Sequence, residues 1–390
     1  MGDLMKICVI YDCLYPYTVG GGERWYRQLA SAYAAEGHEV TYLTLRQWES
    51  GYQPILEGVK VIAVGPRMAL YANGIRRILP PLIFGIGVLL HLLRHGRRYN
   101  FVHGASFPFF SILAAGLIRP LAGYQLVIDW LEVWTRGYWH TYLGPLGWVG
   151  WMIQRLCATI PHTGFTFSRL HQQRAQELIG RPVTFLPGMV TEEKIGTASP
   201  MRIPREIVYA GRLIPEKRVG LLIKALPIVM EALPDIQATI LGMGPEYDHL
   251  NTLVAELGLS GRVSMPGFVD AEELEDVIRG AAVLVQPSER EGYGMVVIEA
   301  AARGVPVVVV AAPDNAAVEL VEESVNGSIS KNDRPETLAD AIISSIQSSN
   351  NLRKSTQHWY NYNSKKLMFS SSFAIIQRKL KIPEINASAQ

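Results

Sequence analysis

The chain has 390 residues, of which 48% are hydrophobic and 18% charged, and its mean hydropathy is +0.12. At about 150 residues per domain, this length predicts two domains and excludes a single small module, while the apolar content excludes a wholly disordered chain. The formal charge of +2, the absence of a G-X-Y period and the lack of an apolar run of ~20 residues argue against nucleic-acid binding, collagen and an integral membrane protein.

The first half of the chain alternates apolar runs with helical spacing. The apolar runs predict strands at residues 7–11, 40–43, 61–64, 101–103, 125–128 and 165–167. Residues 23–36 predict a helix that ends at Gly37. Strands that alternate with helices predict βαβ units and a parallel sheet.

A second series of strands follows at residues 206–210, 238–241, 263–265, 283–285 and 305–310. Between the two series, residues 181–204 have the density of proline and glycine expected of a linker. We therefore predict an α/β protein of two Rossmann-like domains, residues 1–187 and residues 188–350. Ligands bind at the carboxyl ends of parallel strands, so we expect the active site in a cleft between the two sheets.

Residues 351–390 differ from both domains in composition. They contain seven Lys or Arg and one acid, Glu384, and they are rich in serine and asparagine. This tail predicts either a solvated terminus or a helix that returns to the N-terminal domain.

The strongest motif is E-G-Y-G-M-V-V-I-E, from Glu291 to Glu299, where a strand passes into a helix that we expect to begin near Tyr293. Gly292 and Gly294 allow the backbone to approach a ligand closely, and the free N–H groups of a first helical turn favour an anion. The motif predicts a phosphate site, with Glu299 placed to accept from ribose hydroxyls and Glu291 from sugar hydroxyls. A surface helix with two ordinary glutamates is the alternative.

The second motif is Y-A-G-R-L-I-P-E-K-R, at residues 209–218 after the first strand of the second series. Arg212 and Lys217 lie on either side of a turn at Pro215, so both cations can converge above the strand end and neutralise a diphosphate. The sequence contains no D-x-D pair that could hold a divalent metal against a diphosphate, which predicts a site without metal. A solvated charged loop is the alternative.

The third motif is G-G-G-E-R, at residues 20–24 between the first strand and the first helix. It is not G-x-G-x-x-G, and no acidic residue ends the second strand, so a dinucleotide cofactor is disfavoured. The glycines still allow backbone N–H groups to face a ligand. A flexible turn is the alternative.

In their order and spacing these motifs resemble the family 4 retaining glycosyltransferases, which have the two-domain GT-B fold. The resemblance extends to about residue 348 and also includes residues 37–40, 242–244, 267–269, 287–288 and 304–307. It implies that Arg212 and Lys217 hold the nucleotide diphosphate and that Glu291 contacts the transferred sugar. The residues expected to bind the donor are Gly21, Gly22, Gly211, Phe268, Val269, Ser288, Gly292, Tyr293, Gly294 and Glu299.

More specific roles follow from the resemblance for four of these residues. The backbone at Tyr293 and Gly294 meets phosphate, and the loop of Phe268 and Val269 lies by the base.

Family members commonly place a histidine after a strand in the middle of the first domain, where this sequence has Leu131. Asp129, which we include among the catalytic candidates, or Glu132 could supply acceptor contacts instead, although a buried, satisfied carboxylate is an equal alternative. His103 is a further candidate, with a structural role as its alternative.

The anomeric configuration can be retained if the acceptor hydroxyl attacks from the face that the diphosphate leaves, because an oxygen of the diphosphate can take the proton. Preorganised charge on the diphosphate then supplies most of the barrier reduction. We expect a metal-independent hexosyltransferase that uses a nucleotide sugar as substrate and needs no cofactor. A sugar-nucleotide epimerase and a catalytically silent membrane-associated binding protein remain alternatives.

The region from Arg67 to Arg98 contains six arginines and no acid, and residues 78–93 are uncharged. Pro80, Pro81 and two glycines indicate a segment that is too short and too interrupted to span a bilayer but that could lie at an anionic membrane surface. The arginines expected at lipid phosphates are Arg76, Arg77, Arg94, Arg97 and Arg98. A buried helix capped by arginines is the alternative, and a lipid-linked or other glycan acceptor is our expectation.

The three cysteines are odd in number and lack the spacing of metal ligands, and residues 1–20 lack the order of a signal peptide. We therefore expect a cytoplasmic protein with reduced thiols, peripheral to the cytoplasmic face of a membrane.

Overall fold

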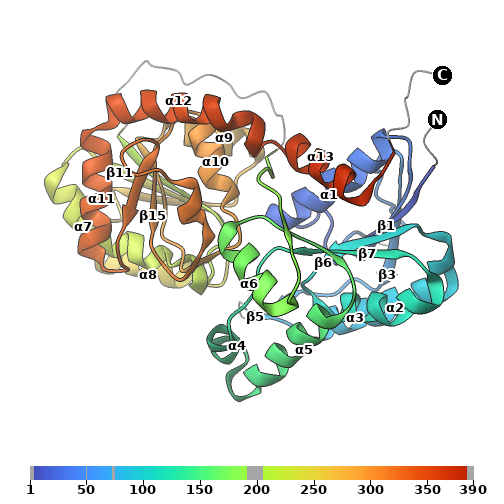
Figure 1. The fold of residues 1–390 in the computed structure, drawn as a ribbon. Coiled ribbons are helices and arrows are strands. Elements are labelled where there is room, and N and C mark those ends of the chain that lie inside the picture. Colours follow the sequence, from blue (N-terminus) through green and yellow to red (C-terminus); the bar gives the residue numbers. More distant parts are fainter. Residues whose placement is uncertain (1–3, 50, 73–74, 191–204, 384–390) are drawn as a thin grey trace. The chain divides into compact units, whose positions relative to one another are not determined.

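The computed structural model describes residues 4–49, 51–72, 75–190 and 205–383, which divide into two units (Figure 1). The first comprises Met1–Pro187 with Ser370–Gln390, and the second comprises Gly188–Phe369. Each unit is a parallel sheet flanked by helices, so the predicted class of two Rossmann-like α/β domains is confirmed. The cleft expected between them stays a prediction, and residues 191–204 of the predicted linker lie outside the described residues.

The first unit contains a seven-stranded parallel sheet. Its strands are β1 (Lys6–Ile10), β2 (Glu39–Leu45), β3 (Val59–Gly65), β6 (Phe101–Ala105), β7 (Gln125–Trp130), β8 (Thr163–Thr166) and β9 (Thr184–Phe185). They lie in the order β3-β2-β1-β6-β7-β8-β9. The central strands are buried almost throughout, as expected for a sheet with helices on both faces. A short antiparallel pair, β4 (Tyr71–Ala72) and β5 (Ile75–Arg76), stands apart from this sheet.

Helices cover the two faces of this sheet. On one face lie α1 (Gly21–Ala35) and α13 (Phe369–Leu380), whose Tyr33 and Phe373 rings lie 5.3 Å apart (Figure 1). On the other lie α2 (Leu79–His95), α3 (Phe109–Ala122) and α5 (Gly147–Thr159). From β1 to β3 the chain moves toward one edge of the sheet, and from β6 to β9 it moves toward the other edge. Right-handed crossovers therefore place the helices of these two segments on opposite faces. The remaining elements are η1 (Gly96–Arg98), α4 (Arg136–Leu143), η2 (Gly144–Leu146) and α6 (Arg169–Ile179).

The segment expected to be interrupted by proline and glycine is one continuous helix, α2. Pro80 and Pro81 lie in its first turn, where the missing N–H groups have no helical partner anyway. Gly85 is needed for packing, because a Cβ there would lie 2.6 Å from the Cβ of Phe110 on α3. By length and composition alone, the stretch Leu79–Arg98 could cross a membrane, a property that it shares with many core helices of globular proteins.

The second unit contains a six-stranded parallel sheet. Its strands are β10 (Glu206–Ala210), β11 (Gln237–Leu241), β12 (Val263–Gly267), β13 (Val283–Gln286), β15 (Val307–Val310) and β17 (Gly327–Ser330). Their order is β12-β11-β10-β13-β15-β17, and β14 (Arg290–Glu291) pairs separately with β16 (Asp314–Asn315). The helical elements are η3 (Pro215–Lys217), α7 (Val219–Ala232), α8 (Tyr247–Glu256), α9 (Ala271–Gly280), α10 (Met295–Ala302), η4 (Ala316–Leu320), α11 (Pro335–Gln347) and α12 (Ser349–Leu367).

The basic C-terminal tail is helical where it is described. Its first helix, α12, packs on α10 in the second unit, and Arg353 donates hydrogen bonds to the carbonyls of Ala281 at 2.6 Å and Arg279 at 3.4 Å. Its second helix, α13, belongs to the first unit, where Ile376 is fully buried. Within the described residues, the tail therefore consists of two docked helices rather than a solvated terminus.

The environment of His162 predicts a loss of stability in acid. Burial lowers the pKa of His162 to about 4, and its Nε2 accepts a hydrogen bond of 3.1 Å from the Trp130 indole, which requires the neutral ring. Since an unfolded histidine has a pKa near 6.5, this stabilisation is complete above about pH 6.5 and is lost as the pH falls toward 4.

We expect the melting temperature to fall between pH 6.5 and pH 4, and His162→Gln, which keeps an acceptor but cannot gain a proton, to make that fall shallower. His91, whose pKa burial also lowers to about 4, will supply part of the remaining slope. Thermal melts of both proteins over this range check the prediction. Identical pH profiles for the two proteins would contradict it.

Candidate active site

The carboxyl ends of β10 and β13 carry most of the residues predicted for the donor. Lys217 ends η3, shortly after β10, and Glu291 ends β14, between β13 and α10. Although they are distant in the sequence, the two side chains form an ion pair, and both are largely buried, with 15% and 12% of the side chain exposed. The structure thus joins the first and second motifs through these two residues.

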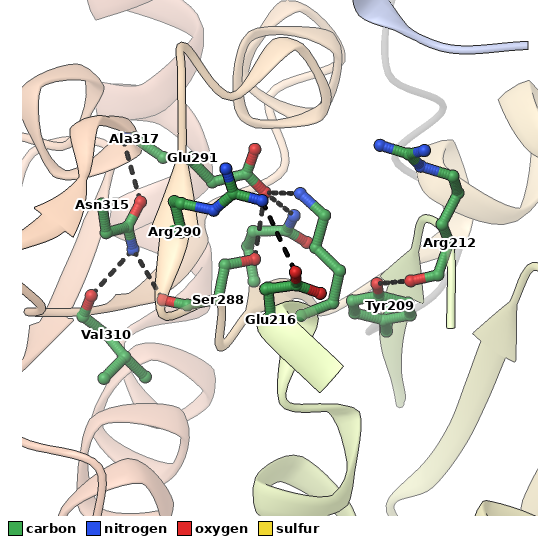
Figure 2. Close-up of polar contacts among 11 residues, drawn as sticks. Tyr209, Arg212, Glu216, Ser288, Arg290, Glu291, Val310, Asn315 and Ala317 are labelled. Carbon is green, nitrogen blue, oxygen red and sulfur yellow. Dashed lines mark hydrogen bonds and ion pairs between the residues drawn. The ribbon is translucent and has the colours of Figure 1, made fainter. Parts of the chain in front are cut away.

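Glu291 has two further hydrogen-bond donors (Figure 2). Its Oε1 accepts from Gln286 Nε2 at 2.6 Å and from Ser288 Oγ at 3.0 Å, in addition to the contact with Lys217. Charge-assisted hydrogen bonds of this kind are stronger than neutral ones, so they hold the carboxylate in one place. We call Lys217, Gln286, Ser288 and Glu291 the Glu291 cluster.

A buried asparagine supports the Glu291 cluster from one side, at Ser288 (Figure 2). Asn315 Nδ2 donates to the carbonyls of Ser288 at 3.1 Å and Val310 at 2.8 Å, and its Oδ1 accepts from the Ala317 N–H at 3.0 Å. Sequence analysis missed both Asn315 and Gln286. The available signal for Gln286 was a polar residue at the end of an apolar strand, in V-L-V-Q, and for Asn315 a polar residue shortly after a run of valines, in V-V-V-V-A-A-P-D-N.

Ser288 has a different role from the predicted one. Its side chain is fully buried and its hydroxyl donates a hydrogen bond to Glu291. Direct contact of this hydroxyl with the nucleotide sugar is therefore contradicted. It instead positions the carboxylate that was predicted to meet the sugar.

The turn into α10 is close to the prediction, since the helix begins at Met295 rather than near Tyr293. Gly294 caps it in the left-handed conformation, with φ 100°, and a Cβ there would lie 2.7 Å from the Cβ of Ala317. Both constraints require glycine at this position. Tyr293 and Gly294 are buried, whereas Gly292 and, farther along α10, Glu299 are partly exposed.

Arg212 and Phe268 are exposed at the carboxyl ends of two strands, β10 and β12, that lie on either side of β11. Arg212 follows Gly211 after β10, and its carbonyl accepts a 3.0 Å hydrogen bond from Tyr209, while its side chain extends away from the Tyr209 ring (Figure 2). Phe268 directly follows β12 and is 67% exposed, an unusual exposure for a phenylalanine, and the next residue, Val269, is partly buried. An exposed ring at a strand end can stack on a nucleobase.

In the first unit, the glycine motif begins α1 at the carboxyl end of β1. Gly20 precedes the helix in an extended conformation, and Gly21 and Gly22 form its start. A Cβ on Gly22 would lie 2.5 Å from the Tyr11 hydroxyl and 3.6 Å from Leu131, so close packing explains this glycine. Leu131, which occupies the position of the family histidine, therefore borders the glycine turn.

The structure contradicts the catalytic role predicted for Asp129, because this side chain is fully buried and its oxygens are occupied. One oxygen lies 2.9 Å from His103 Nε2, and the other accepts from the Trp25 indole and the Tyr26 hydroxyl, each at 2.9 Å. His103 is buried too, with Tyr33 at 3.1 Å from its Nδ1. The alternative interpretation, a satisfied carboxylate with a structural histidine, describes both residues. Glu132 is partly exposed and accepts from the Trp134 indole at 2.8 Å.

We expect Asp129→Asn to destabilise the first unit by about 1–3 kcal/mol, because the amide replaces one of the two acceptor oxygens with an NH2 group that would face an existing donor. Urea denaturation measures this loss. Glu132→Gln, at a partly exposed position, serves as the control and is expected to leave the midpoint nearly unchanged. Full stability of Asp129→Asn together with lost turnover would restore the catalytic role.

The arginines predicted to contact a membrane lie in α2 or close to its ends. Arg76 ends β5, and Arg77, Arg94, Arg97 and Arg98 are exposed. Arg97 Nε donates at 3.3 Å to the carbonyl of Leu121, at the end of α3, so this arginine also caps a helix. Among the described residues, no group of three or more His, Cys, Asp or Glu is arranged to hold a metal ion.

Two family models together match most of the chain. The model for the glycosyl transferase 4-like domain matches residues 20–187, and the model for glycosyl transferases group 1 matches residues 200–366. The chain belongs to the family 4 glycosyltransferases. The first match lies within the first unit and the second match lies within the second unit.

Individual relatives of this glycosyltransferase are distant. Glycogen synthase of Mycobacterium tuberculosis is 27% identical over 78% of this chain and 77% of its own length. A GDP-mannose-dependent alpha-(1-6)-phosphatidylinositol monomannoside mannosyltransferase of Mycolicibacterium smegmatis is 34% identical over 32% of this chain and 34% of its own. The chain spans about a third of the first curated relatives that it matches.

The fold itself is shared with solved GT-B structures. A crystal structure of HepE from Anabaena in complex with UDP and glucose is 18% identical, with a TM-score of 0.74, and the match covers 97% of this chain and 99% of that one. At this identity the likeness shows the fold.

Proposed function

We propose that this protein is a retaining hexosyltransferase that moves a sugar from a nucleoside-diphosphate sugar to a hydroxyl acceptor. The Glu291 cluster carries the proposal, because it places a carboxylate and an ammonium group together at the carboxyl end of a parallel sheet. A carboxylate held by fixed donors suits sugar hydroxyls, and an adjacent cation suits a diphosphate.

The donor is proposed to bind across the carboxyl ends of β10, β13 and β12. Arg212 and Lys217 contact the diphosphate, and Lys217 shares its N–H groups between Glu291 and phosphate oxygens. The start of α10 at Tyr293 and Gly294 adds backbone donors, and Glu299 accepts from the ribose. The glycines Gly21, Gly22, Gly211 and Gly292 permit close approach, and the exposed Phe268, with Val269, covers the base.

In the proposed reaction, the acceptor oxygen forms its bond to the anomeric carbon as the bond to the diphosphate oxygen breaks. Attack occurs on the face that the leaving group departs from, and the acceptor proton passes to the departing diphosphate. The protein then needs no strong base, which fits a first unit whose Asp129 is sequestered in its core. Arg212 and Lys217 stabilise the charge that develops, so the reaction uses neither a metal nor a further cofactor.

We propose a lipid-linked acceptor or glycan precursor and a peripheral site of action on the cytoplasmic face of an anionic membrane. The exposed arginines around α2 support this placement, since basic side chains near anionic lipid contribute about 1 kcal/mol each. The mannosyltransferase relative, whose name specifies a phosphatidylinositol monomannoside, adds support from one related protein.

We expect Arg212→Ala and Lys217→Ala each to lower turnover about 10²-fold, because preorganised charge on a leaving group is worth roughly 3 kcal/mol of barrier. Release of nucleoside diphosphate, measured with and without an acceptor, is the assay, and dependence on acceptor separates transfer from epimerisation. Both variants should fold, since Glu291 keeps its Gln286 and Ser288 donors. Lys224→Ala, at an exposed position on α7, is the control, and normal rates in both site variants would refute the diphosphate assignment.

We expect turnover to stay largely intact after divalent ions are removed, because fixed cationic side chains of the protein neutralise the diphosphate. The measurement is the same assay in excess chelator, followed by addition of magnesium or manganese. A strict requirement for an added ion would overturn the metal-independent proposal.

A further inference from the structure

The outer surface of the helix layer α2, α3 and α5 is apolar. On α2 the exposed side chains recur at helical spacing, and the same holds on α3 and α5. Leu117 and Leu121 on α3 are each 67% exposed, and Trp148 on α5 is 55% exposed. We call this surface the apolar face; it comprises Leu82, Ile86, Leu90, Leu93, Leu117, Leu121, Leu146, Trp148, Met152 and Leu156.

The apolar face is continuous over the three helices. In the first unit α2 packs beside α3 and α3 beside α5, and they form one layer under the sheet (Figure 1). The opposite side of each helix is buried, as shown by Val88 on α2, Ile112 on α3 and Cys157 on α5. The exposed residues therefore point away from the sheet, on one common surface.

Large apolar side chains are exposed more often on this surface than on the other described parts of the chain. More than half of the large hydrophobic side chains exposed among the described residues belong to α2, α3, α5 or their immediate flanks. The helix α9 in the second unit, by contrast, carries Glu272, Glu273, Glu275 and Asp276. A contiguous apolar surface of this kind marks an interaction site.

The charge of the surrounding segment indicates the partner. Between Glu57 and Glu177 the sequence contains only two acids, Asp129 and Glu132. Asp129 is buried and Glu132 accepts from the Trp134 indole. The helices of the layer carry no acid at all, while Arg77, Arg94, Arg97, Arg98 and Arg155 are exposed around them. An apolar surface flanked by exposed arginines is complementary to an anionic bilayer.

We infer that the apolar face inserts into the boundary between headgroups and acyl chains of an anionic membrane, with α2, α3 and α5 parallel to the membrane plane. The arginines then reach lipid phosphates. Because one side of α2 belongs to the core of the first unit, this helix lies on the bilayer and does not cross it. The inference rests on the membrane association in the proposed function and deepens it, since it adds α3, which sequence analysis did not assign, and adds insertion of apolar side chains to charge attraction.

Substitutions that spare every arginine test insertion separately from charge. We expect the combination of Leu117→Gln, Leu121→Gln, Met152→Gln and Leu156→Gln to weaken partitioning onto vesicles of equal parts phosphatidylglycerol and phosphatidylcholine by at least about tenfold. Ile55→Gln with Tyr362→Gln, at exposed apolar positions outside the face, is the matched control and should sediment with vesicles like the wild type. The α3 pair and the α5 pair are also measured alone, beside melting curves, so that a folding defect in one variant does not decide the result.

A second comparison isolates the arginines. Replacing Arg76, Arg77, Arg94, Arg97 and Arg98 by serine should release the protein at moderate salt, whereas wild type should retain part of its binding at high salt through the apolar face. Phospholipids brominated on their acyl chains should quench wild-type fluorescence more than that of Trp148→Phe, which reports insertion at α5.

Unchanged partitioning of folded apolar-face variants, or equal quenching with and without Trp148, would overturn the inference. So would a wild type that forms a dimer, dissociates on the same glutamine substitutions and ignores vesicles, since the face would then join two copies. Nucleotide-sugar binding is measured without vesicles. Its failure would refute the proposed transferase function and leave the vesicle result standing.

Discussion

The pairing of Glu291 with Lys217 is the constraint on which the proposed site depends. One carboxylate receives Lys217, Gln286 and Ser288, and the Ser288 carbonyl is in turn held by Asn315. These contacts connect segments that follow β10, β13 and β15, so they fix the carboxyl edge of the second sheet as one unit. Glu291 neutralises Lys217, so the site does not have to hold an unpaired buried cation before the proposed diphosphate binds.

The two units use a buried carboxylate in opposite ways. Glu291 lies at a strand end and is partly exposed, whereas Asp129 is sealed beneath α1 by Trp25, Tyr26 and His103. Burial, together with the neighbouring Asp129, raises the pKa of Tyr26 well above its usual range, which keeps that hydroxyl a donor. A core carboxylate with this many donors stabilises the start of α1, and the glycine turn that begins it, rather than meeting an acceptor.

Much of the fold followed from the sequence, because apolar runs and their spacing determine βαβ units locally; every predicted strand is present, with small shifts at its ends. The errors concern contacts between residues far apart in the chain. Asp129 could not be distinguished from a catalytic acid without knowing that Trp25 and His103 surround it, and the hydroxyl of Ser288 turned out to face Glu291. Gly85 suggested a broken segment, but it allows α2 to pack against Phe110, which only the tertiary structure reveals. The extension of the apolar face from α2 to α3 was missed for the same reason, because these helices become neighbours only in the folded unit.

The central claim is that the carboxyl edge of the second sheet binds a nucleoside-diphosphate sugar. Thermal stabilisation of the wild type by UDP-, ADP-, GDP- and dTDP-sugars tests it most directly, since a ligand at 100 times its dissociation constant adds about 2.7 kcal/mol to the free energy of unfolding. The account predicts that at least one of these donors raises the melting temperature and that the shift is largely lost in Lys217→Ala. No stabilisation by any of them, or an equal shift in Lys217→Ala, would contradict it.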